Sequence, residues 1–351
     1  MSIPDHRKAI DKLDAQIVKL LNERTRHVLQ IGEMKIKAGE AIYAPHRERV
    51  ILRRICKLNE GPIKDDSLRS IYREIMSSAL SLEKSMTIAY LGPEATFTHQ
   101  AAVQKFGSSL RYTAQKTIAD IFTEVTRSRA DYGVVPVENS TEGVVTHTLD
   151  MFVESNLKIV AQIILPIQYC LASAEPMEKI QRVYVHPQAL GQCRLWIQRN
   201  LPKAEIQETS SNARSAELAG GGSAAVTGLL AAEKYGLKVL ERDIQDFTDN
   251  VTRFLVLGRQ CGPATGRDRT SLMFSIADEV GALYRALSAF WRFKLNMNNI
   301  ESRPSKRKAW EYFFFVDCDG HMTDPKVAKV IANLSEACNF VKVLGSYPNS
   351  E

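Results

Sequence analysis

The amino-acid sequence predicts a multidomain protein in which an all-helical segment comes first, an α/β segment follows it and an α+β segment ends the chain. Three observations predict this order. With 351 residues, the chain exceeds what one hydrophobic core usually organises. Apolar residues recur at helical spacing up to about residue 85, and short apolar strands then alternate with helices to about residue 258. A polar stretch with glycine and proline, residues 259–268, separates the last segment from the second.

The first segment is expected to form three helices. The first runs from Pro4 to about Ala38 with its proline in an acceptable first-turn position, and the others run over 45–58 and 65–84. A helix of this length with an apolar seam has little to pack against inside a segment this small. We therefore expect a second copy of the same helix as its partner.

The apolar stripe of the first helix also holds two cations, Arg24 and Lys35. At about 100° per residue, both point within about 20° of the mean direction of the stripe, and Arg7 lies at its edge. Buried cations without partners cost roughly several kcal/mol, so the pattern predicts a bound anion. The second helix adds Arg47 upstream of its seam, and the third adds Glu83 at the border of its seam. Alternatively, Arg24 and Lys35 extend to solvent or pair with acids on another helix.

Three loops rich in Ser, Thr and Asn follow predicted strands of the second segment. They comprise residues 92–98, 136–143 and 209–212. Ligands of open α/β sheets bind outside the carboxyl ends of the strands, so the three loops together predict a polar pocket for an oxygen-rich anion. Each loop by itself is equally well explained as an ordinary helix N-cap. The strands predicted in this segment are 88–91, 133–137, 158–167, 182–186 and 253–257.

A further motif, Thr252-Arg253-Phe254, lies where the last of these strands begins. It combines a hydroxyl, a guanidinium and an aromatic ring. Because side chains alternate along a strand, Thr252 and Phe254 share one face and Arg253 lies on the other. In a regular strand, the three side chains therefore cannot all line one pocket.

The third segment has the element order strand, helix, strand, strand, helix, strand. This order is typical of a ferredoxin-like half-sandwich. We predict the strands at 271–277, 297–302, 312–318 and 341–346, and the helices at 282–290 and 326–338.

Composition excludes several classes of protein. The net charge of +6 is spread along the chain without a long basic block, which favours small acidic substrates over nucleic acid. No stretch approaches about 18 apolar residues and the N-terminus lacks an apolar signal core, so we expect no membrane association and a cytoplasmic location. The six cysteines show no close pairing and no metal-ligand spacing with the histidines, so we expect reduced thiols and no metal. The glycines at 220 and 222 do not follow a strand, so we expect no dinucleotide cofactor either.

Longer motifs give the chain a family resemblance over about residues 4–348. The first segment resembles the all-helical chorismate mutases, the second the prephenate dehydratases, and the third the ACT regulatory domains. The order of the three resembles the bifunctional chorismate mutase/prephenate dehydratase family. The motifs are 6–14, 21–24, 31–35 and 45–48 in the first segment, 92–98, 135–143, 186–190 and 252–254 in the second, and 281–283 and 301–304 in the third.

The resemblance implies a mutase domain at 1–86, a two-lobed dehydratase domain with a periplasmic-binding-protein-like fold at 87–260, and an ACT domain at 268–351. It implies a homodimer or higher homo-oligomer that converts chorismate to prephenate and then to phenylpyruvate. Phenylalanine would inhibit it by binding the ACT domain at a subunit interface. The resemblance implies no cofactor.

The resemblance also implies functional residues. Lys35, Glu83 and Thr252 would be catalytic. The chorismate pocket would hold Arg7, reaching it from a second chain, with Arg24, Lys35, Arg47, Glu48 and Glu83. The prephenate pocket would hold Thr96, Thr98, Asn139, Ser140, Thr141, Gln192, Ser211, Thr252, Arg253 and Phe254. The phenylalanine site would hold Gly281, Ala282 and Leu283, with a facing loop formed by Glu301, Ser302, Arg303 and Pro304.

The chemistry assigns roles to some of these residues. Lys35 would donate to the ether oxygen of chorismate, and Glu83 could do so only when protonated. Thr252 would donate a hydrogen bond or relay a proton to the oxygen that leaves prephenate. Arg253 would bind a carboxylate or brace the loop, and both interpretations stay open. Deletion of 268–351 is expected to abolish phenylalanine inhibition and to leave some dehydratase activity.

Three positions depart from the family's pattern. Ala44 stands where many mutases have Asp, and Gln168 and Val185 stand where dehydratases usually have His and Ser. These departures favour a second hypothesis, a ligand-binding regulator with the same folds that has lost the dehydratase chemistry. The retained cations and Thr252 disfavour it.

Overall fold

The computed structural model describes residues 2–40, 42–247, 249–305 and 311–349. The chain divides into two compact units. The first contains the chain up to Thr87 together with Lys105–Arg111, and the second contains Ile88–Gln104 and everything from Tyr112 onward. In the described part of the chain, no helix is both long enough and apolar enough to cross a membrane.

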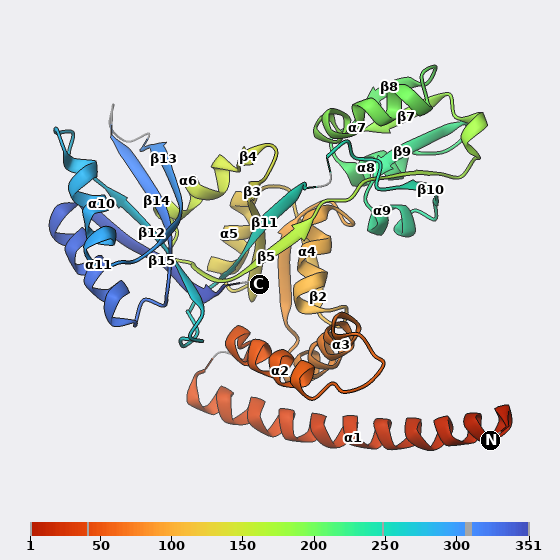
Figure 1. Ribbon diagram of the computed structural model, residues 1–351, viewed down its shortest axis with the longest axis horizontal. Helices are drawn as coiled ribbons and strands as arrows, with labels where there is room; N and C mark the ends of the chain where they lie inside the picture. The colour runs from red at the N-terminus through yellow and green to blue at the C-terminus, as the bar shows by residue number, and fades with distance from the viewer. Residues whose placement is uncertain (1, 41, 248, 306–310, 350–351) are drawn as a thin grey trace. The chain divides into compact units, whose positions relative to one another are not determined.

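The first unit is built from three helices, as predicted. They are α1 (Ile3–Ala38), α2 (Pro45–Lys57) and α3 (Asp65–Glu83). Ser2 and Asp5 form a capping box where α1 begins, and Gly39, with φ at +68°, ends it in the left-handed conformation that suits glycine. Figure 1 shows the N-terminal part of α1 extending past α2 and α3.

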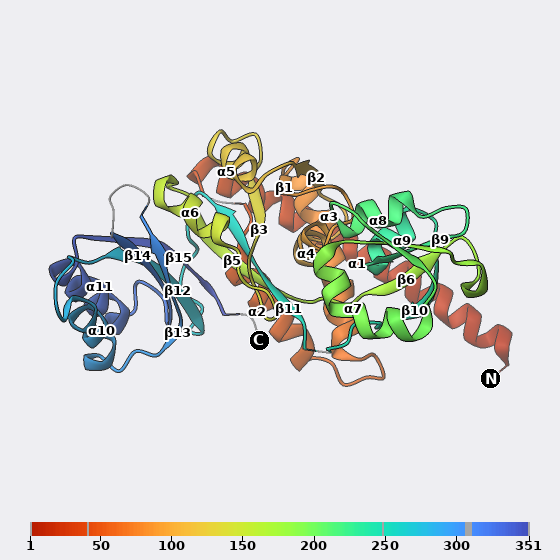
Figure 2. The same cartoon turned by 90° about the horizontal axis from the view of Figure 1, so that it is seen from above.

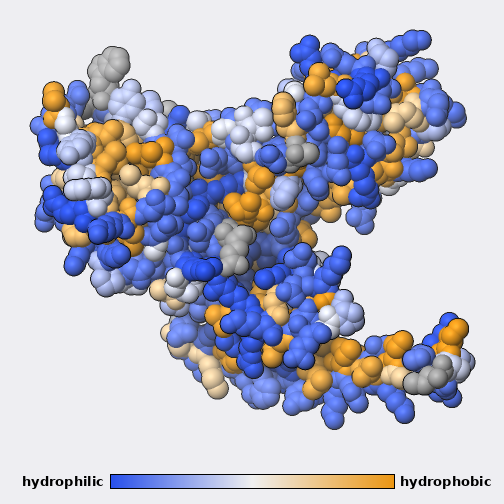
Figure 3. Space-filling model, viewed as in Figure 1, coloured by the Kyte–Doolittle hydropathy of each residue, from blue (hydrophilic) through white to orange (hydrophobic). Residues whose placement is uncertain are grey.

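The extended part of α1 leaves apolar side chains in water. Ile10, Leu13, Ile17 and Leu20 are between 52% and 63% exposed. Figure 3 shows hydrophobic residues along this helix. Folded proteins rarely leave such an apolar seam in water.

The last two residues of α4 (Phe97–Phe106) and the residues that follow them to Arg111 also belong to the first unit. Lys105 donates to Oε2 of Glu48 at 2.8 Å, and the rings of Phe106 and Tyr43 lie 4.9 Å apart. The backbone N–H and the hydroxyl of Ser108 donate to the carboxylate of Glu74 on α3. No sequence pattern predicts these contacts, because they join residues 34 to 63 positions apart and follow no period.

The second unit begins with a mixed sheet that forms the first lobe of an α/β fold. Its strand order is β2-β1-β3-β11-β5, with β4 paired to β3. The parallel pair β1 and β3 is continued by β11, which runs antiparallel between β3 and β5. The elements are β1 (Thr87–Leu91), β2 (Arg111–Gln115), β3 (Tyr132–Asn139), β4 (Gly143–Val144), β5 (Lys158–Pro166) and β11 (Val251–Gly258), with α5 (Ile118–Thr126) and α6 (Thr146–Glu154).

A second sheet forms the other lobe, with strand order β10-β6-β9-β7-β8. The chain passes from the first sheet to the second after β5 and returns before β11, which confirms the predicted two-lobed architecture. The elements are β6 (Cys170–Ser173), β7 (Arg182–Val185), β8 (Glu205–Glu208), β9 (Ser223–Thr227) and β10 (Lys238–Arg242), with the 3-10 turn η1 (Met177–Lys179) and helices α7 (Pro187–Asn200), α8 (Asn212–Leu218) and α9 (Leu229–Lys234).

A third, fully antiparallel sheet has the order β13-β14-β12-β15, as predicted for a ferredoxin-like fold. Its helices α10 and α11 cover one face of it (Figure 2). The predicted loop over 301–304 is wrong, since those residues continue the edge strand. The elements are β12 (Asp268–Ser275), β13 (Met297–Pro304), β14 (Tyr312–Asp319) and β15 (Phe340–Pro348), with α10 (Ala282–Arg292) and α11 (Pro325–Ala337).

The other face of the third sheet shares a hydrophobic core with the first lobe. Buried side chains of the third sheet, such as Phe315 and Leu344, pack in one cluster with Phe152 of α6 and Ile159 of β5. Gly345 lies so close to the Ile159 backbone that no β-carbon fits there. Removal of 268–351 would therefore expose this core to water. Such a deletion would disturb the first lobe as well as the regulation, so it cannot remove regulation alone.

Candidate active sites

The first site is a cluster of charged groups among the three helices of the first unit. Arg24 and Lys35 of α1 exert their charge on Glu83 of α3, and Lys35 and Arg47 exert theirs on His46 of α2. Lys35 also donates to the carbonyl oxygen of Ile42 at 2.9 Å. Thus the structure brings together the two cations of the predicted stripe and the carboxyl group predicted to face them.

Two nitrogens of this cluster are buried without a hydrogen-bond partner among the described residues. They are Nη1 of Arg24 and Nδ1 of His46. Burial and the charges of Lys35 and Arg47 lower the pKa of His46, so this ring is neutral near pH 7. Native proteins rarely bury unsatisfied donors, so Arg24 points to a ligand that carries acceptor oxygens.

Glu83 lies against the backbone of α1 at Gly32. A β-carbon at Gly32 would come within 2.7 Å of Oε2 of Glu83, so only glycine leaves this carboxyl its position. Burial raises the pKa of Glu83 above its usual range, although the charges of Lys35 and Arg24 oppose the shift. The carboxyl therefore takes up a proton more readily than an exposed glutamate does.

Two other residues of the predicted chorismate pocket, Arg7 and Glu48, make no contact with Arg24 or Lys35 among the interactions of the described residues. Arg7 precedes Arg24 by 17 residues, which is roughly 25 Å along a helix, and it is exposed. Glu48 accepts from Lys105 at 2.8 Å and from the hydroxyl of Tyr43 at 3.2 Å. Arg7 therefore cannot reach the Arg24 cluster of its own chain, and the carboxylate of Glu48 already has two partners.

The second site is a hydrogen-bonded group around Thr252 at the start of β11. Thr252 and Asn139 are directly paired in the β11–β3 ladder. Nδ2 of Asn139 donates to Oγ1 of Thr252 and to Oδ1 of Asn250, each at 2.8 Å. Since the Thr252 hydroxyl accepts from Asn139, its own hydrogen remains available for a bound acceptor oxygen.

Asn139 also shapes the loop that follows β3. Its Oδ1 accepts from the backbone N–H groups of Thr141 and Glu142, both at 3.0 Å. The hydroxyl of Ser140 donates to the carbonyl oxygen of Asp249 and accepts from the N–H of Val251. The polar side chains predicted from this loop thus lie beside Thr252, as expected from the carboxyl end of β3.

Asn250 and Gln192 join this group to the second lobe. Nδ2 of Asn250 donates to Oε1 of Gln192, which lies on α7, and Asn250 is only 2% exposed. Gln192 is one of the predicted site residues, whereas Asn250 is not. The signal that could have found it is its place two residues before Thr252, since alternation puts both on the same side of the strand.

Thr96 and Ser211, which were also predicted for the prephenate pocket, have hydrogen-bond partners within the chain. Thr96 donates to the carbonyl oxygen of Leu91 and accepts from the N–H of His99, while Ser211 caps α8 by accepting from the N–H of Arg214. For these two residues the structure supports the alternative of a helix cap. Thr98 and Phe254 are 6% and 2% exposed.

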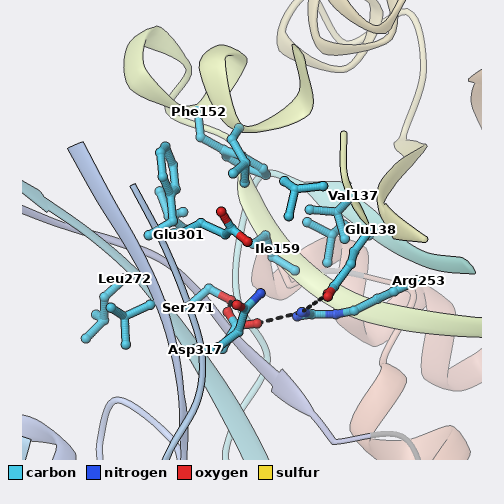
Figure 4. A pocket seen from close by; sticks show the side chains of 16 residues that line it. Val137, Glu138, Phe152, Ile159, Arg253, Ser271, Leu272, Glu301 and Asp317 are labelled. Atoms are coloured by element: carbon cyan, nitrogen blue, oxygen red, sulfur yellow. Dashed lines mark hydrogen bonds and ion pairs between the residues drawn. The ribbon is translucent and has the colours of Figure 1, made fainter. Parts of the chain in front are cut away.

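Arg253 points away from the Thr252 group, as alternation along the strand predicts. Nη1 forms an ion pair with Oδ2 of Asp317 at 2.6 Å, Nη2 donates to the hydroxyl of Tyr347 at 2.9 Å, and Nε donates to Gln162 at 3.0 Å. Asp317 and Tyr347 belong to the third sheet. Arg253 therefore does not lie in the Thr252 group, and its contacts join the first lobe to the third sheet rather than brace the loop (Figure 4).

The predicted phenylalanine residues fall in two separate places within the chain. Gly281, with φ at +81°, and Ala282 and Leu283 line a cavity of about 470 Å³ at the start of α10. Glu301 lines instead a small cavity of about 30 Å³ between the third sheet and the first lobe. Arg303 donates to Asp150 of α6 at 3.5 Å. Within one chain, Glu301 and Arg303 therefore face the first lobe, whereas Ser302 and Pro304 pair with Phe314 and Tyr312, two residues that line the larger cavity.

Three family models match the chain one after another. The chorismate mutase type II model matches residues 6–84, the prephenate dehydratase model 88–262 and the ACT domain model 270–336. A bifunctional chorismate mutase/prephenate dehydratase from Aquifex aeolicus is 49% identical over 351 residues, covering 98% of this chain and 97% of that protein. The chain belongs to the bifunctional chorismate mutase/prephenate dehydratase family.

Further relatives agree with this membership. A bifunctional chorismate mutase/prephenate dehydratase from Neisseria gonorrhoeae is 44% identical, covering 98% of this chain and 96% of that protein. A solved prephenate dehydratase from Arthrobacter aurescens in complex with L-Phe is 36% identical, with a TM-score of 0.70 over 75% of this chain and 90% of that one. The predicted family, its fold classes and the presence of both enzyme domains are thus confirmed.

Within this bifunctional family, the departure at Val185 has a simple structural setting. Val185 ends β7 and is fully buried. Its carbonyl oxygen accepts from the N–H of Thr209. The position is thus part of the packing of the second lobe, and the missing serine hydroxyl is no ground for the alternative of an inactive regulator.

Proposed function

We propose that the chain rearranges chorismate to prephenate at the Arg24 cluster and converts prephenate to phenylpyruvate at the Thr252 group, with phenylalanine as its inhibitor. The corresponding domains would be residues 1–86, 87–260 and 268–351. The observation that carries the mutase assignment is the buried Nη1 of Arg24, which lacks a partner among the described residues beside Lys35 and Glu83. The cytoplasmic location stays a prediction from composition.

The Arg24 cluster suits a reaction that needs no covalent chemistry. Chorismate carries two carboxylates, and its rearrangement breaks an ether C–O bond while a C–C bond forms. The site must hold the compact conformer and stabilise the negative charge that develops on the ether oxygen. Arg24 and Arg47 would bind carboxylates, and Lys35 would donate to the ether oxygen.

A second chain would complete this site. Arg7 is too far along α1 to reach the Arg24 of its own chain, and the exposed seam between Ile10 and Leu20 offers a surface for a neighbouring α1. In a dimer of two-fold symmetry, each chain would supply Arg7 to the other's site. This arrangement supports the predicted homodimer.

Glu83 would make the mutase depend on pH. Its carboxyl can donate to the ether oxygen only in the protonated form, and burial raises its pKa. We expect the mutase rate to fall as pH rises through this raised pKa, and a Glu83→Gln chain, which always donates, to lose that dependence. Measuring kcat between pH 5 and 9 for both chains tests this. The same fall in both chains would assign the dependence to another group.

The Thr252 group suits the loss of carbon dioxide and hydroxide from prephenate. The ring carboxylate leaves as carbon dioxide, its bonding electrons enter the ring, and the ring hydroxyl departs as water once it gains a proton. Thr252 would donate its hydrogen to that departing oxygen while Asn139 holds the threonine in place. A threonine hydroxyl is a weak acid, so we assign it a hydrogen bond or a proton relay rather than full protonation.

The cavity at the start of α10 would bind phenylalanine. The first N–H groups of this helix can donate hydrogen bonds to a carboxylate, and Asp278 and Glu311 line the same cavity with negative charge for an ammonium group. Leu283, Tyr284 and Phe314 supply apolar surface for a ring. Glu301 and Arg303, which face the first lobe in their own chain, would have to come from a second chain to join this site.

One assay tests the whole proposal. Purified protein supplied with chorismate should form phenylpyruvate with prephenate as a transient, and phenylalanine should slow the second step. Binding of both substrates without turnover would instead select the ligand-binding regulator. Prephenate accumulation with no phenylpyruvate would remove the dehydratase assignment alone.

A further inference from the structure

Two neighbouring residues of β11 face in opposite directions and belong to two different polar groups. The Thr252 side chain lies in the group with Asn139, and the Arg253 side chain lies in a group formed with the third sheet. The partner strand β3 repeats the arrangement, because Glu138, paired with Arg253 in the ladder, also lines the small cavity next to the third sheet. Each residue of the Thr252–Asn139 pair is therefore covalently attached to a residue that faces the third sheet.

Arg253 uses all three of its guanidinium nitrogens in the second group. Nη1 pairs with Asp317, Nη2 donates to Tyr347 and Nε donates to Gln162. The side chains of Arg253 and Asp317 are each 11% exposed. An ion pair that is nearly buried, and whose guanidinium nitrogens all have partners, holds those partners in one geometry far better than a surface ion pair does.

The donor and acceptor roles of the hydroxyl groups next to the Arg253–Asp317 pair follow from the number of hydrogens each group carries. Ser271 donates its only hydrogen to the carboxylate of Asp317, so the contact between Ser271 and Tyr347, 2.8 Å long, must use the hydrogen of Tyr347. Burial raises the pKa of Tyr347 to about 12, so the phenol keeps that hydrogen. Its oxygen is then the acceptor for Arg253. The donor and acceptor roles in the cluster thus depend on one another, so a shift of the third sheet affects the cluster as a whole.

The two strands that hold this cluster also reach the cavity assigned to phenylalanine. On β14, Tyr312 and Phe314 line that cavity, and Asp317 follows three residues after Phe314. On β12, Ser271 lies in the cluster, and Ile276 just beyond the strand lines the cavity. At about 3.3 Å per residue, roughly 10 to 17 Å of strand separate the two ends.

Arg253 also has a second anion within reach. Oε2 of Glu138 lies 3.9 Å from Nη1, compared with 2.6 Å for Oδ2 of Asp317 (Figure 4). The small cavity lined by Glu138, Arg253 and Asp317 leaves space of about one water molecule beside them. A modest displacement of β14 can therefore change which carboxylate Arg253 binds more closely.

We propose that Arg253 is a positioning residue that couples the phenylalanine cavity to the Thr252–Asn139 pair. Its two competing partners are Asp317 of the third sheet and Glu138 of the first lobe. The inference rests on the proposed phenylalanine site and adds the route by which occupation of that site reaches the dehydratase. By linkage, the coupling can only arise if phenylalanine binds the two arrangements with different affinity.

The test separates phenylalanine binding from phenylalanine inhibition in the full-length chain. In an Asp317→Asn chain, we expect phenylalanine still to bind, by calorimetry, while residual dehydratase activity at saturating phenylalanine rises at least about fivefold over the unmodified chain. Asp319→Asn is the matched control. It makes the same change on the same strand, where Asp319 contacts Asn296 and not the cluster, and it should be inhibited like the unmodified chain.

A second variant covers the case in which Asp317→Asn fails to fold. Arg253→Lys keeps the buried charge and loses the planar guanidinium with its several hydrogen bonds, so it should show the same weakened inhibition. Its control is Arg259→Lys, the same change just beyond β11. Full inhibition in the folded Arg253→Lys chain, or in a folded Asp317→Asn chain, would overturn the coupling. If the unmodified chain neither binds phenylalanine nor is inhibited by it, the proposed phenylalanine site fails, and the coupling fails with it.

Discussion

An Arg24→Ala chain should lose chorismate mutase activity by at least about 10²- to 10³-fold in kcat/KM, because truncating the cationic partner of a buried, hydrogen-bonded carboxylate costs about 2–5 kcal/mol. The guanidinium of Arg24 is buried with an unpartnered nitrogen, and its loss would also leave Glu83 with one cation fewer. Dehydration of added prephenate should stay within about twofold of the unmodified chain, because the Thr252 group is built from other residues.

Arg26→Ala is the matched control for this variant. Arg26 is exposed and lies two residues further along α1, so its loss removes the same charge from the chain without touching the cluster. Both chains should be assayed for chorismate and prephenate turnover at the same ionic strength. Equal mutase rates in the two variants would mean that the cluster does not bind chorismate.

The same variant shows whether two chains build one site. Equal amounts of Arg7→Ala and Arg24→Ala chains, mixed and allowed to exchange, form hybrid dimers in half of the cases. If Arg7 acts in trans, each hybrid has one intact site, so mutase activity should recover to about a quarter of the unmodified level. No recovery despite demonstrated exchange would show that Arg7 does not serve a neighbouring chain.

A Thr252→Val chain should lose prephenate dehydratase activity by about 10²- to 10⁴-fold in kcat, the range expected for one proton-transfer group. Valine keeps the shape of threonine and removes the hydroxyl that would donate to the departing oxygen. It also strands an N–H of Asn139, which costs roughly 1–3 kcal/mol of stability. Chorismate supplied to this chain should therefore be converted to prephenate and stop there.

Thr252→Ser separates chemistry from stability. Serine restores a hydroxyl at the same position, so its dehydratase rate should lie far closer to the unmodified chain than to Thr252→Val. Thermal unfolding of both variants shows how much of the loss is due to the stranded amide. A serine variant as slow as the valine variant would argue that the methyl packing of Thr252, and not its hydroxyl, matters.

Much of the fold was predictable because it depends on local periodicity. The seam of α1, the alternation along β11 and the strand order after residue 268 each follow from side-chain spacing, and all of them agree with the structure. The opposite orientation of Arg253 and Thr252 followed from the same rule. The Arg24–Lys35 stripe was predictable too, since a cation in an apolar face conflicts with burial.

Other features could not be predicted, because they join residues far apart in the chain. Glu48 meets Lys105, Asn139 meets Asn250, and Arg253 meets Asp317, and no period links any of these pairs. Thr96 and Ser211 illustrate a different limit. A hydroxyl at the start of a helix looks the same in sequence whether it caps the helix or faces a ligand, and only the hydrogen bonds distinguish the two cases.

The core shared by the first lobe and the third sheet has a consequence for how the protein is made. The first sheet has one of its inner strands, β11, at residues 251–258, and its hydrophobic core also contains Leu344 and Tyr347. During synthesis, the early strands of this lobe, the last of which ends at Pro166, must wait for about 180 further residues before that core can close. The first lobe therefore leaves the ribosome with apolar surface uncovered. The last strand to be translated, β15, is the one that covers this surface and protects it from misassembly.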